Sequence, residues 1–263
     1  MKISRTQIIA TLGPASNTEE VISKMLDHHM DVVRLNFSWG TYDEHEDFIN
    51  KARSVSGGRG TVTPIIQDLS GPRVQDSDGH HFGGGSVITE KDKADIIFGV
   101  NLNIEYVAMS YVGNADDVKE LRNILDGVGS TSKIIAKIER VEAVENIDEI
   151  IKVADAIMIA RGDLGEAIPI EKLPFVQHDL IKKCNKAGKM VIVATEMMSS
   201  MTGKDVPSRA DVTDVANAVL SGADAVMLSN ETAVGKYPVK VIEVMEKILV
   251  EAEGHVKSEY INL

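Results

Sequence analysis

The chain has 263 residues, 43% of them hydrophobic, and a formal net charge of −12 at pH 7. This length supports a sizeable core and is close to the roughly 250 residues typical of one barrel domain. The negative charge argues against nucleic acid or an anionic membrane surface as the main partner. The single cysteine, Cys184, excludes an internal disulfide and fits a reducing compartment.

The N-terminal residues, Met1 to Gln7, are polar and lack the apolar core of a secretory signal. No apolar run in the sequence approaches the length of a membrane span. We therefore expect a cytoplasmic protein, in which Cys184 is a small buried side chain rather than a nucleophile.

One unit recurs along the chain: a short apolar strand, a polar turn and an amphipathic helix. Strands are expected at residues 8–12, 32–38, 64–69, 106–110, 133–139, 156–163, 190–196 and 225–231. A first helix is expected from residue 19, with Asn17 or Thr18 as its N-terminal cap. Further helices are expected at residues 43–54, 115–125 and 238–252, and one is expected to begin near residue 89. The fifth and sixth strands are each followed by a helical pattern. Because parallel neighbours need a crossover helix, this order predicts an α/β fold, either a (β/α)8 TIM barrel or a doubly wound open sheet.

Most of these strands carry polar residues at their C-terminal ends. A barrel gathers such ends at one mouth, whereas an open sheet spreads them along an edge. We therefore predict a TIM barrel that forms a single domain over residues 1–263. The polar residues are Thr11, Arg34, Asn36, Ser38, Asp68, Ser110, Lys137, Glu139, Asp163, Thr195, Glu196 and Glu231.

Lys137 and Glu139 are the most informative of these residues. Side chains alternate along a strand, so both point to the same face. Burial of either charge alone is costly, so the pair needs mutual compensation, a metal ion or an anionic ligand. The next strand also ends in charge, at Asp163. On this pattern alone, an ion pair that fills the barrel interior is as good an interpretation as a functional site.

The segment 73–88 interrupts the strand–helix alternation, because it is rich in glycine and polar residues. We expect it to be a loop over the barrel mouth. His80 and His81 could bind a metal ion, but adjacent histidines in a glycine-rich loop are more often solvated. No metal site is predicted there.

Several stretches, in order along nearly the whole chain, resemble the pyruvate kinase family. They are IATLGPAS at 9–16, VRLNFS at 33–38, Asp68 with Gly71 and Pro72, TEKD at 89–92, IAKIER at 135–140, ARGDLG at 160–165, VAT at 193–195 and SNETAVGKYP at 229–238. The resemblance implies the catalytic barrel of that family and favours the barrel over the open sheet.

Carried over residue by residue, the resemblance implies three catalytic residues. Lys137 would lie beside the transferred phosphoryl group and the developing enolate, Arg34 would reach the phosphate, and Thr195 would lie near the carbon that gains or loses a proton. The backbone around Arg161, Gly162 and Asp163 would bind the substrate carboxylate.

The resemblance also implies two cation sites. Glu139 and Asp163 would hold Mg2+ or Mn2+ against phosphoenolpyruvate or pyruvate, and carboxylates with open positions suit such a hard cation. Asn36, Ser38, Asp68 and the Leu69 carbonyl match a K+ site. Arg73 stands where family members that do not need K+ carry lysine, which implies that K+ is dispensable.

The chain departs from the family in several places. The lid domain that the family inserts after the third strand is expected to be replaced by the loop 73–88, and no C-terminal regulatory domain is expected. Trp39, Gln75 and Glu44 replace a histidine, an arginine and a tyrosine of the nucleotide side, so this side is expected to be eroded. Glu196 replaces a glutamine and could act as an acid or base.

The resemblance implies a phosphotransferase of glycolysis that forms pyruvate and ATP from phosphoenolpyruvate and ADP through a metal-stabilised enolate, slowed by the missing lid. The alternative is a Mg2+-dependent lyase, an oxaloacetate decarboxylase or aldolase that uses no nucleotide. A non-catalytic scaffold is less well supported, because it has no need for costly buried charges. Small molecules are the expected partners, and a homo-oligomer is compatible with the sequence.

Overall fold

The computed structural model describes residues 3–76 and 79–256. Within them, the central strands are hydrogen-bonded in the order β1-β10-β9-β8-β7-β6-β3-β2 and close into a barrel. This closure confirms the predicted TIM barrel and excludes the open sheet. The strands are β1 (Gln7–Thr11), β2 (Val32–Asn36), β3 (Ile65–Asp68), β6 (Tyr106–Met109), β7 (Lys133–Ile138), β8 (Ala156–Ala160), β9 (Met190–Ala194) and β10 (Ala225–Leu228).

Helices follow the strands in the expected alternation. The Thr18 side chain accepts a hydrogen bond from the Val21 amide at 3.2 Å, so Thr18 rather than Asn17 caps the first helix. None of the described helices has the length and apolar character needed to cross a membrane. The helices are α1 (Glu19–Asp27), α2 (Tyr42–Gly58), α3 (Glu90–Asn101), α4 (Ala115–Gly127), α5 (Val141–Glu145), α6 (Ile147–Val153), α7 (Arg161–Ala167), α8 (Leu173–Lys186), α9 (Arg209–Ser221), α10 (Asn230–Ala233) and α11 (Pro238–Gly254).

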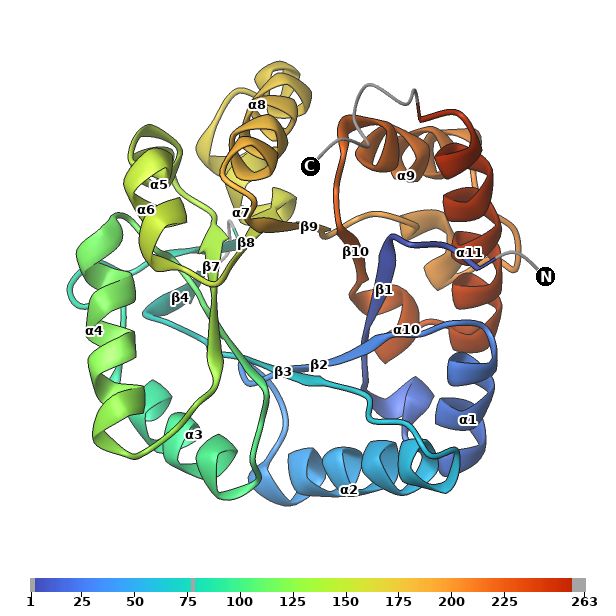
Figure 1. The fold of residues 1–263 in the computed structure, drawn as a ribbon, viewed down its shortest axis with the longest axis horizontal. Coiled ribbons are helices and arrows are strands. Elements are labelled where there is room, and N and C mark those ends of the chain that lie inside the picture. The colour runs from blue at the N-terminus through green and yellow to red at the C-terminus, as the bar shows by residue number, and fades with distance from the viewer. Residues whose placement is uncertain (1–2, 77–78, 257–263) are drawn as a thin grey trace. The chain divides into compact units, whose positions relative to one another are not determined.

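The chain forms two compact units. The first comprises Met1–Leu35, Asp43–Ile65 and Ile192–Leu263, and the second comprises Asn36–Tyr42 and Ile66–Val191. In the first unit β1 pairs in parallel with β2 and β10, and α11 packs against both α1 and α9 (Figure 1). In the second unit β7 pairs in parallel with β6 and β8, and α6 packs against both α4 and α8.

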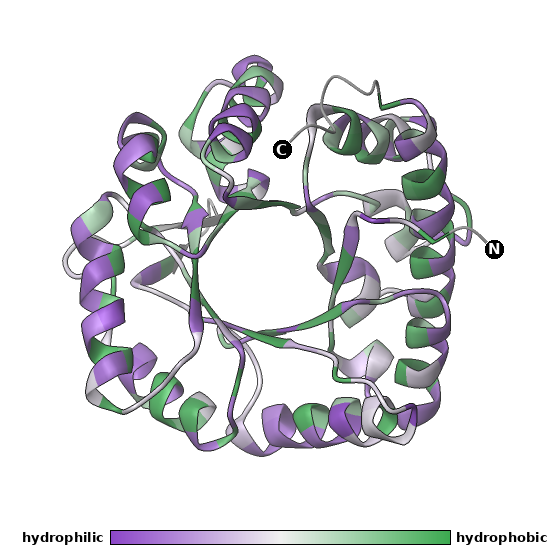
Figure 2. Ribbon diagram, viewed as in Figure 1, coloured by the Kyte–Doolittle hydropathy of each residue, from purple (hydrophilic) through white to green (hydrophobic). Residues whose placement is uncertain are grey.

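The strands and the helices differ in hydropathy, as is expected of strands covered by helices. Strands such as β8 and β9 are almost wholly hydrophobic, whereas each long helix carries both hydrophobic and hydrophilic residues (Figure 2). All five residues of β8 are buried, as is expected of a strand in a parallel sheet covered by helices. Cys184 on α8 is buried and forms no disulfide, as the sequence indicates.

Several strands end earlier than the sequence predicts. β8 ends at Ala160, so Asp163 lies in the first turn of α7, and β10 ends at Leu228, so Glu231 lies in α10. β9 ends at Ala194 because the next two residues, Thr195 and Glu196, have φ angles of 70° and 55°. This left-handed conformation breaks a strand ladder, and the strand period alone does not reveal it.

The segment 73–88 is not irregular throughout, contrary to expectation. β4 (Arg73–Asp76) and β5 (Gly79–Phe82) form an antiparallel hairpin in which Arg73 pairs with Phe82. The Gly83 amide then donates to the Pro72 carbonyl at 2.8 Å, which closes the base of the hairpin. Residues 77–78 and the side chains of Gln75, His80 and His81 lie outside the described part of the structure.

The last helix of the first unit holds the segment that leads into β1. The Glu253 carboxylate of α11 is buried and accepts hydrogen bonds from the amides of Arg5 and Thr6, both at 2.7 Å, and from the Thr6 hydroxyl at 3.0 Å. A buried amide without an acceptor costs free energy, so one carboxylate fixes the start of the first strand.

Substitution of Glu253 tests this arrangement. Glu253→Ala leaves two amides without their acceptor, and we expect it to lower the free energy of unfolding by about 2–3 kcal/mol. Urea denaturation measures this value. Glu251→Ala is the matched control, because Glu251 lies on the same helix and pairs only with the exposed His255 among the described residues. Equal unfolding free energies for the two variants would contradict the assigned role.

Candidate active site

A buried lysine lies at the centre of the second unit's polar residues. Lys137 of β7 places its Nζ atom 2.9 Å from Glu139 Oε1 and 3.0 Å from Asp68 Oδ1, and donates a hydrogen bond to Ser110 Oγ at 2.6 Å. The side chain of Lys137 is 10% exposed, and those of its two acidic partners are 2% and 1% exposed. Three neighbouring strand ends, those of β3, β6 and β7, therefore supply one compact group. Lys137 and Glu139 share a face, as their spacing predicts.

Glu139 is held from two sides. Its Oε1 atom faces Lys137, and its Oε2 atom accepts a hydrogen bond from the Tyr111 amide at 2.7 Å. Tyr111 has a φ angle of 57°, a left-handed conformation that is uncommon for a bulky residue and marks a strained turn after β6. Burial raises the pKa of Glu139, the charge of Lys137 lowers it, and the negative charge of Asp163 raises it further. The net shift is upward.

A second cation faces Asp163. Arg73, the first residue of β4, places Nη2 3.8 Å from Asp163 Oδ1. Burial lowers the pKa of Arg73, but interaction with the Tyr111 hydroxyl and the charges of Asp163 and Glu139 outweigh burial and raise it. The two acidic residues that the resemblance assigns to a divalent cation therefore lie within electrostatic reach of each other and of one arginine.

The base of the hairpin packs on residues that follow β6 and β7. The Phe82 ring lies 5.8 Å from the Tyr111 ring, measured between centroids, and the Arg140 guanidinium lies 4.1 Å above the Phe82 ring. Such a distance is typical of a cation–π contact. Because Phe82 pairs with Arg73, these contacts also hold Arg73 in place.

The charged cluster, defined as Asp68, Lys137, Glu139, Asp163 and Arg73, contains three carboxylates and two cations. It therefore carries one net negative charge when all five groups are ionised. No group of three or more His, Cys, Asp or Glu side chains in the described part of the chain could hold a metal ion. The resemblance implies Glu139 and Asp163 as two oxygen ligands of a divalent cation, and Mg2+ commonly takes few protein carboxylates, with its other ligands from substrate and water. The surplus charge and the raised pKa of Glu139 both fit an added cation.

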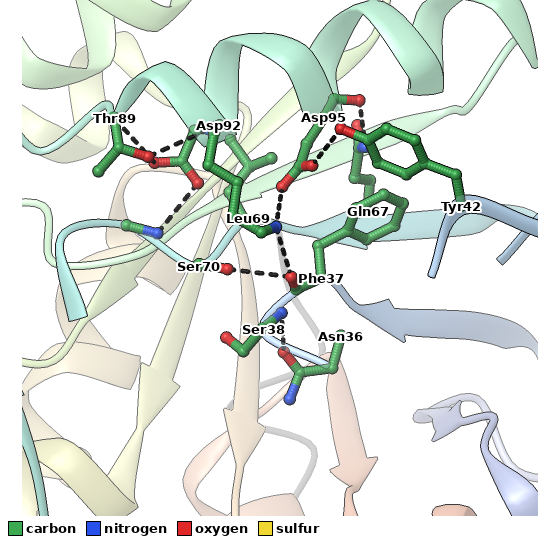
Figure 3. A network of polar contacts seen from close by, with 12 residues as sticks. Asn36, Phe37, Ser38, Tyr42, Gln67, Leu69, Ser70, Thr89, Asp92 and Asp95 are labelled. Atoms are coloured by element: carbon green, nitrogen blue, oxygen red, sulfur yellow. Dashed lines mark hydrogen bonds and ion pairs between the residues drawn. The ribbon is translucent and has the colours of Figure 1, made fainter. Parts of the chain in front are cut away.

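The residues predicted for K+ lie at the turn after β2 and at the end of β3, and Figure 3 shows Asn36, Ser38 and Leu69 among them. Asn36 ends β2, and its Oδ1 atom accepts a hydrogen bond from the Ser38 amide at 3.1 Å. Ser38 lies in the turn, whereas the sequence analysis expects the strand to extend to residue 38. The Phe37 amide donates to the Asp68 carbonyl at 2.9 Å, and the Leu69 carbonyl accepts from the Ser110 hydroxyl at 2.7 Å.

Helix α3 holds this turn through residues to which the sequence analysis assigned no role. Lys91 donates to the Phe37 carbonyl at 2.7 Å and to Asp95 Oδ2 at 2.6 Å, while the Tyr42 hydroxyl donates to Asp95 Oδ1 at 2.8 Å (Figure 3). The Tyr42 ring stacks on Phe98 at 4.5 Å between centroids. Burial and Asp95 raise the pKa of Tyr42 to about 12. The spacing of four between Lys91 and Asp95 was the available signal.

Arg161, Gly162 and Asp163 form the first turn of α7. The Arg161 Nη1 atom lies 3.4 Å from Gln177 Oε1, to which it donates a long hydrogen bond. Arg161 therefore contacts α8, whereas Asp163 is paired with Arg73.

Trp39, one of the departures from the family, has an exposed fraction of 58%.

Two predicted site residues, Arg34 and Thr195, belong to the first unit. Arg34 is buried on β2, and its Nη1 atom donates to Thr11 Oγ1 at 3.1 Å. Thr195 is half-buried directly after β9, and its hydroxyl donates to the Ala194 carbonyl at 2.6 Å. Glu196 is exposed, whereas Glu231 is buried and accepts hydrogen bonds from the Met198 and Ser229 amides. Glu231 therefore holds backbone in place.

Comparison with known proteins identifies the family. The family model for the barrel domain of pyruvate kinase matches residues 3–87 and 84–242. A pyruvate kinase from Dictyostelium discoideum is 36% identical over 336 residues, which cover 95% of this chain and 66% of that protein. A pyruvate kinase from Sporosarcina psychrophila is 35% identical, and the match covers 95% of this chain and 57% of that protein. A pyruvate kinase from Clostridium perfringens is 32% identical, and the match covers 98% of this chain and 72% of that protein.

The chain thus spans 57% to 72% of the length of these relatives. The matched region of the Dictyostelium protein, 336 residues, is longer than the 263 residues of the chain, so this relative carries additional residues inside the aligned region. The two matches of the family model meet at residues 84–87, directly after the β4–β5 hairpin. With the closed barrel and this extent of similarity, the chain belongs to the pyruvate kinase family.

Proposed function

We propose that the protein transfers the phosphoryl group of phosphoenolpyruvate to ADP and releases pyruvate and ATP. The observation that carries the proposal is the buried ammonium of Lys137, held 2.9 Å from the Glu139 carboxylate and 3.0 Å from that of Asp68, while the charge of Asp163 acts on Glu139. Catalysis of phosphoryl transfer rests on positioning and on neutralisation of charge. A fixed ammonium with little freedom to reorganise suits that task.

Each predicted substrate-binding or catalytic residue has a defined part in the proposal. The Lys137 ammonium would stabilise the negative charge that develops on the enolate oxygen as the phosphoryl group leaves. Following the family likeness, Arg34 would bind the phosphate, and Thr195 would lie near the carbon that accepts the proton. Following the same likeness, the amides of Arg161, Gly162 and Asp163 would bind the substrate carboxylate at the first turn of α7.

Glu139 and Asp163 would hold Mg2+ or Mn2+, and this ion would neutralise substrate oxygens when bound. A separate K+ site would comprise Asn36, Ser38, Asp68 and the Leu69 carbonyl. The turn at Asn36 is tied to α3 by Lys91, which would keep the Asn36 and Ser38 oxygens in fixed positions.

Turnover should be slow, because the hairpin takes the place of a water-excluding lid. The additional residues inside the aligned region of the Dictyostelium protein support this interpretation. Loss of a lid leaves the site wetter and weakens its electrostatic interactions. A site without a lid would have room for a bulkier substrate, and this argument favours the second candidate: a Mg2+-dependent lyase that releases pyruvate from oxaloacetate without nucleotide.

The two functions differ in what they require. With Mg2+ and phosphoenolpyruvate, we expect pyruvate only when ADP is present, because a kinase needs a phosphoryl acceptor. Coupled detection of pyruvate measures this reaction, with oxaloacetate and no nucleotide as the parallel assay. Pyruvate released faster from oxaloacetate would contradict the kinase assignment and support the lyase.

Removal of the Lys137 charge tests the core of the proposal. Lys137→Met leaves Asp68 and Glu139 without their shared cation, and we expect kcat to fall by about 100-fold or more. Loss of one partner of a buried ion pair also destabilises, so the unfolding free energy should fall by roughly 3 kcal/mol. Steady-state kinetics and urea denaturation measure the two effects.

The matched control is Lys133→Met. Lys133 begins the same strand, but it is exposed and lies over the Tyr106 ring. We expect kcat to stay near that of the unsubstituted protein. A similar fall in kcat for both variants, each still folded, would show that Lys137 has no special part in the reaction.

Arg73 bears on the requirement for K+. By the family likeness, a cationic side chain at this position takes over the charge of K+, so the rate should not change when K+ replaces tetramethylammonium at constant ionic strength. Initial rates in the two salts test this expectation. A large rate increase in K+ would refute it.

A further inference from the structure

The hairpin brings a cation of the chain itself to the carboxylates at which a divalent cation is expected. Arg73 Nη2 lies 3.8 Å from Asp163 Oδ1, and the charges of both Asp163 and Glu139 act on its guanidinium. We propose that Arg73 is a tethered competitor of the divalent cation, one that must leave Asp163 or share it before the metal ion binds. This inference rests on the proposed roles of Glu139 and Asp163.

The hairpin fixes the backbone of Arg73, and the guanidinium is only partly exposed. The side chains of Arg73 and Asp163 are only 24% and 19% exposed, so solvent screens the pair incompletely. The Arg73 amide donates to the Gly71 carbonyl at 2.8 Å, and Arg73 pairs with Phe82 across the hairpin. Phe82 is in turn packed between Tyr111 and Arg140. Much of the entropic cost of placing the arginine is therefore met by the fold.

The Arg73–Asp163 contact affects metal binding because few carboxylate oxygens of the site are available to a metal ion. Glu139 already uses Oε1 for Lys137 and Oε2 for the Tyr111 amide. Asp163 therefore offers the more accessible oxygens of the two, and Arg73 lies against one of them. A metal ion that binds there meets a positive charge at the same carboxylate, and like charges at such distances repel.

The charge balance leads to the same conclusion. The charged cluster has one net negative charge with Arg73 in place, and it would have two without it. Removal of the guanidinium should therefore increase the attraction for a divalent cation. Coupling between two ligands of one site is commonly worth 5-fold or more in affinity.

The coupling must also act in the opposite direction. If Arg73 lowers the affinity for the metal ion, bound metal ion must weaken the Arg73–Asp163 contact by the same factor. The family likeness does not imply this link. Loop 73–88 was expected to stand in for a lid, whereas its first residue is an ion-pair partner of the site.

The test is direct binding of Mn2+, measured from the electron paramagnetic resonance signal of the free ion, so that no activity is needed. We expect Arg73→Gln to bind Mn2+ at least about fivefold more tightly than the unsubstituted protein. Arg140→Gln is the matched control. It removes the same charge and disturbs the same hairpin through Phe82, but the carboxylate paired with Arg140 is that of Glu142 on the surface. Because Arg140→Gln leaves the Arg73 guanidinium in the protein, it should tighten Mn2+ binding clearly less than Arg73→Gln does.

A third variant separates this inference from the proposed function. Glu139→Gln should weaken Mn2+ binding in both the unsubstituted and the Arg73→Gln backgrounds. If it does, and Arg73→Gln binds Mn2+ no more tightly than the unsubstituted protein, only the competition by Arg73 is refuted. Equal gains for Arg73→Gln and Arg140→Gln would also refute direct competition. If Glu139→Gln changes nothing, the ligand assignment falls, and the inference falls with it.

Discussion

The structure of the site depends on one ammonium group shared by two buried carboxylates. Lys137 compensates both Asp68 and Glu139, and each of the three side chains is at most 10% exposed. Without the ammonium, two negative charges would face each other in a medium that solvates them poorly. Its position fixes the geometry of three strand ends at once, and these are the ends at which enzymes of this fold place their chemistry.

The turn after β6, helix α7 and the β4–β5 hairpin each add a charged group or a backbone contact to the site around Lys137. The left-handed turn at Tyr111 aims an amide at Glu139, and the first turn of α7 presents Asp163. The hairpin adds Arg73, so the site has its own cation on the side where a metal ion is expected. If the hairpin stands where relatives carry a lid, as we propose, a low affinity for the metal ion and an open mouth would both follow from it.

The sequence predicts the barrel and the Lys137–Glu139 pair for clear physical reasons: the eightfold strand–helix alternation, and the period of two within a strand. It does not predict where strands end, because polar residues such as Asp163 and Glu231 continue a strand pattern while the backbone already turns into a helix. The left-handed conformations of Tyr111 and Thr195 carry no signal in residue type. The pairing of β4 with β5 is hidden by glycine and polar residues, which are as typical of a loop.

The central claim is that the Lys137 ammonium, with Glu139 and Asp163 beside it, binds a small dianion together with a divalent cation. A crystal structure with Mn2+ and oxalate, a planar dianion that resembles an enolate of pyruvate, tests this claim most directly. We expect an anomalous peak for manganese in coordination contact with Glu139 and Asp163, and an oxalate oxygen within hydrogen-bond distance of Lys137 Nζ. Manganese bound at other residues, or oxalate bound away from Lys137, would contradict it.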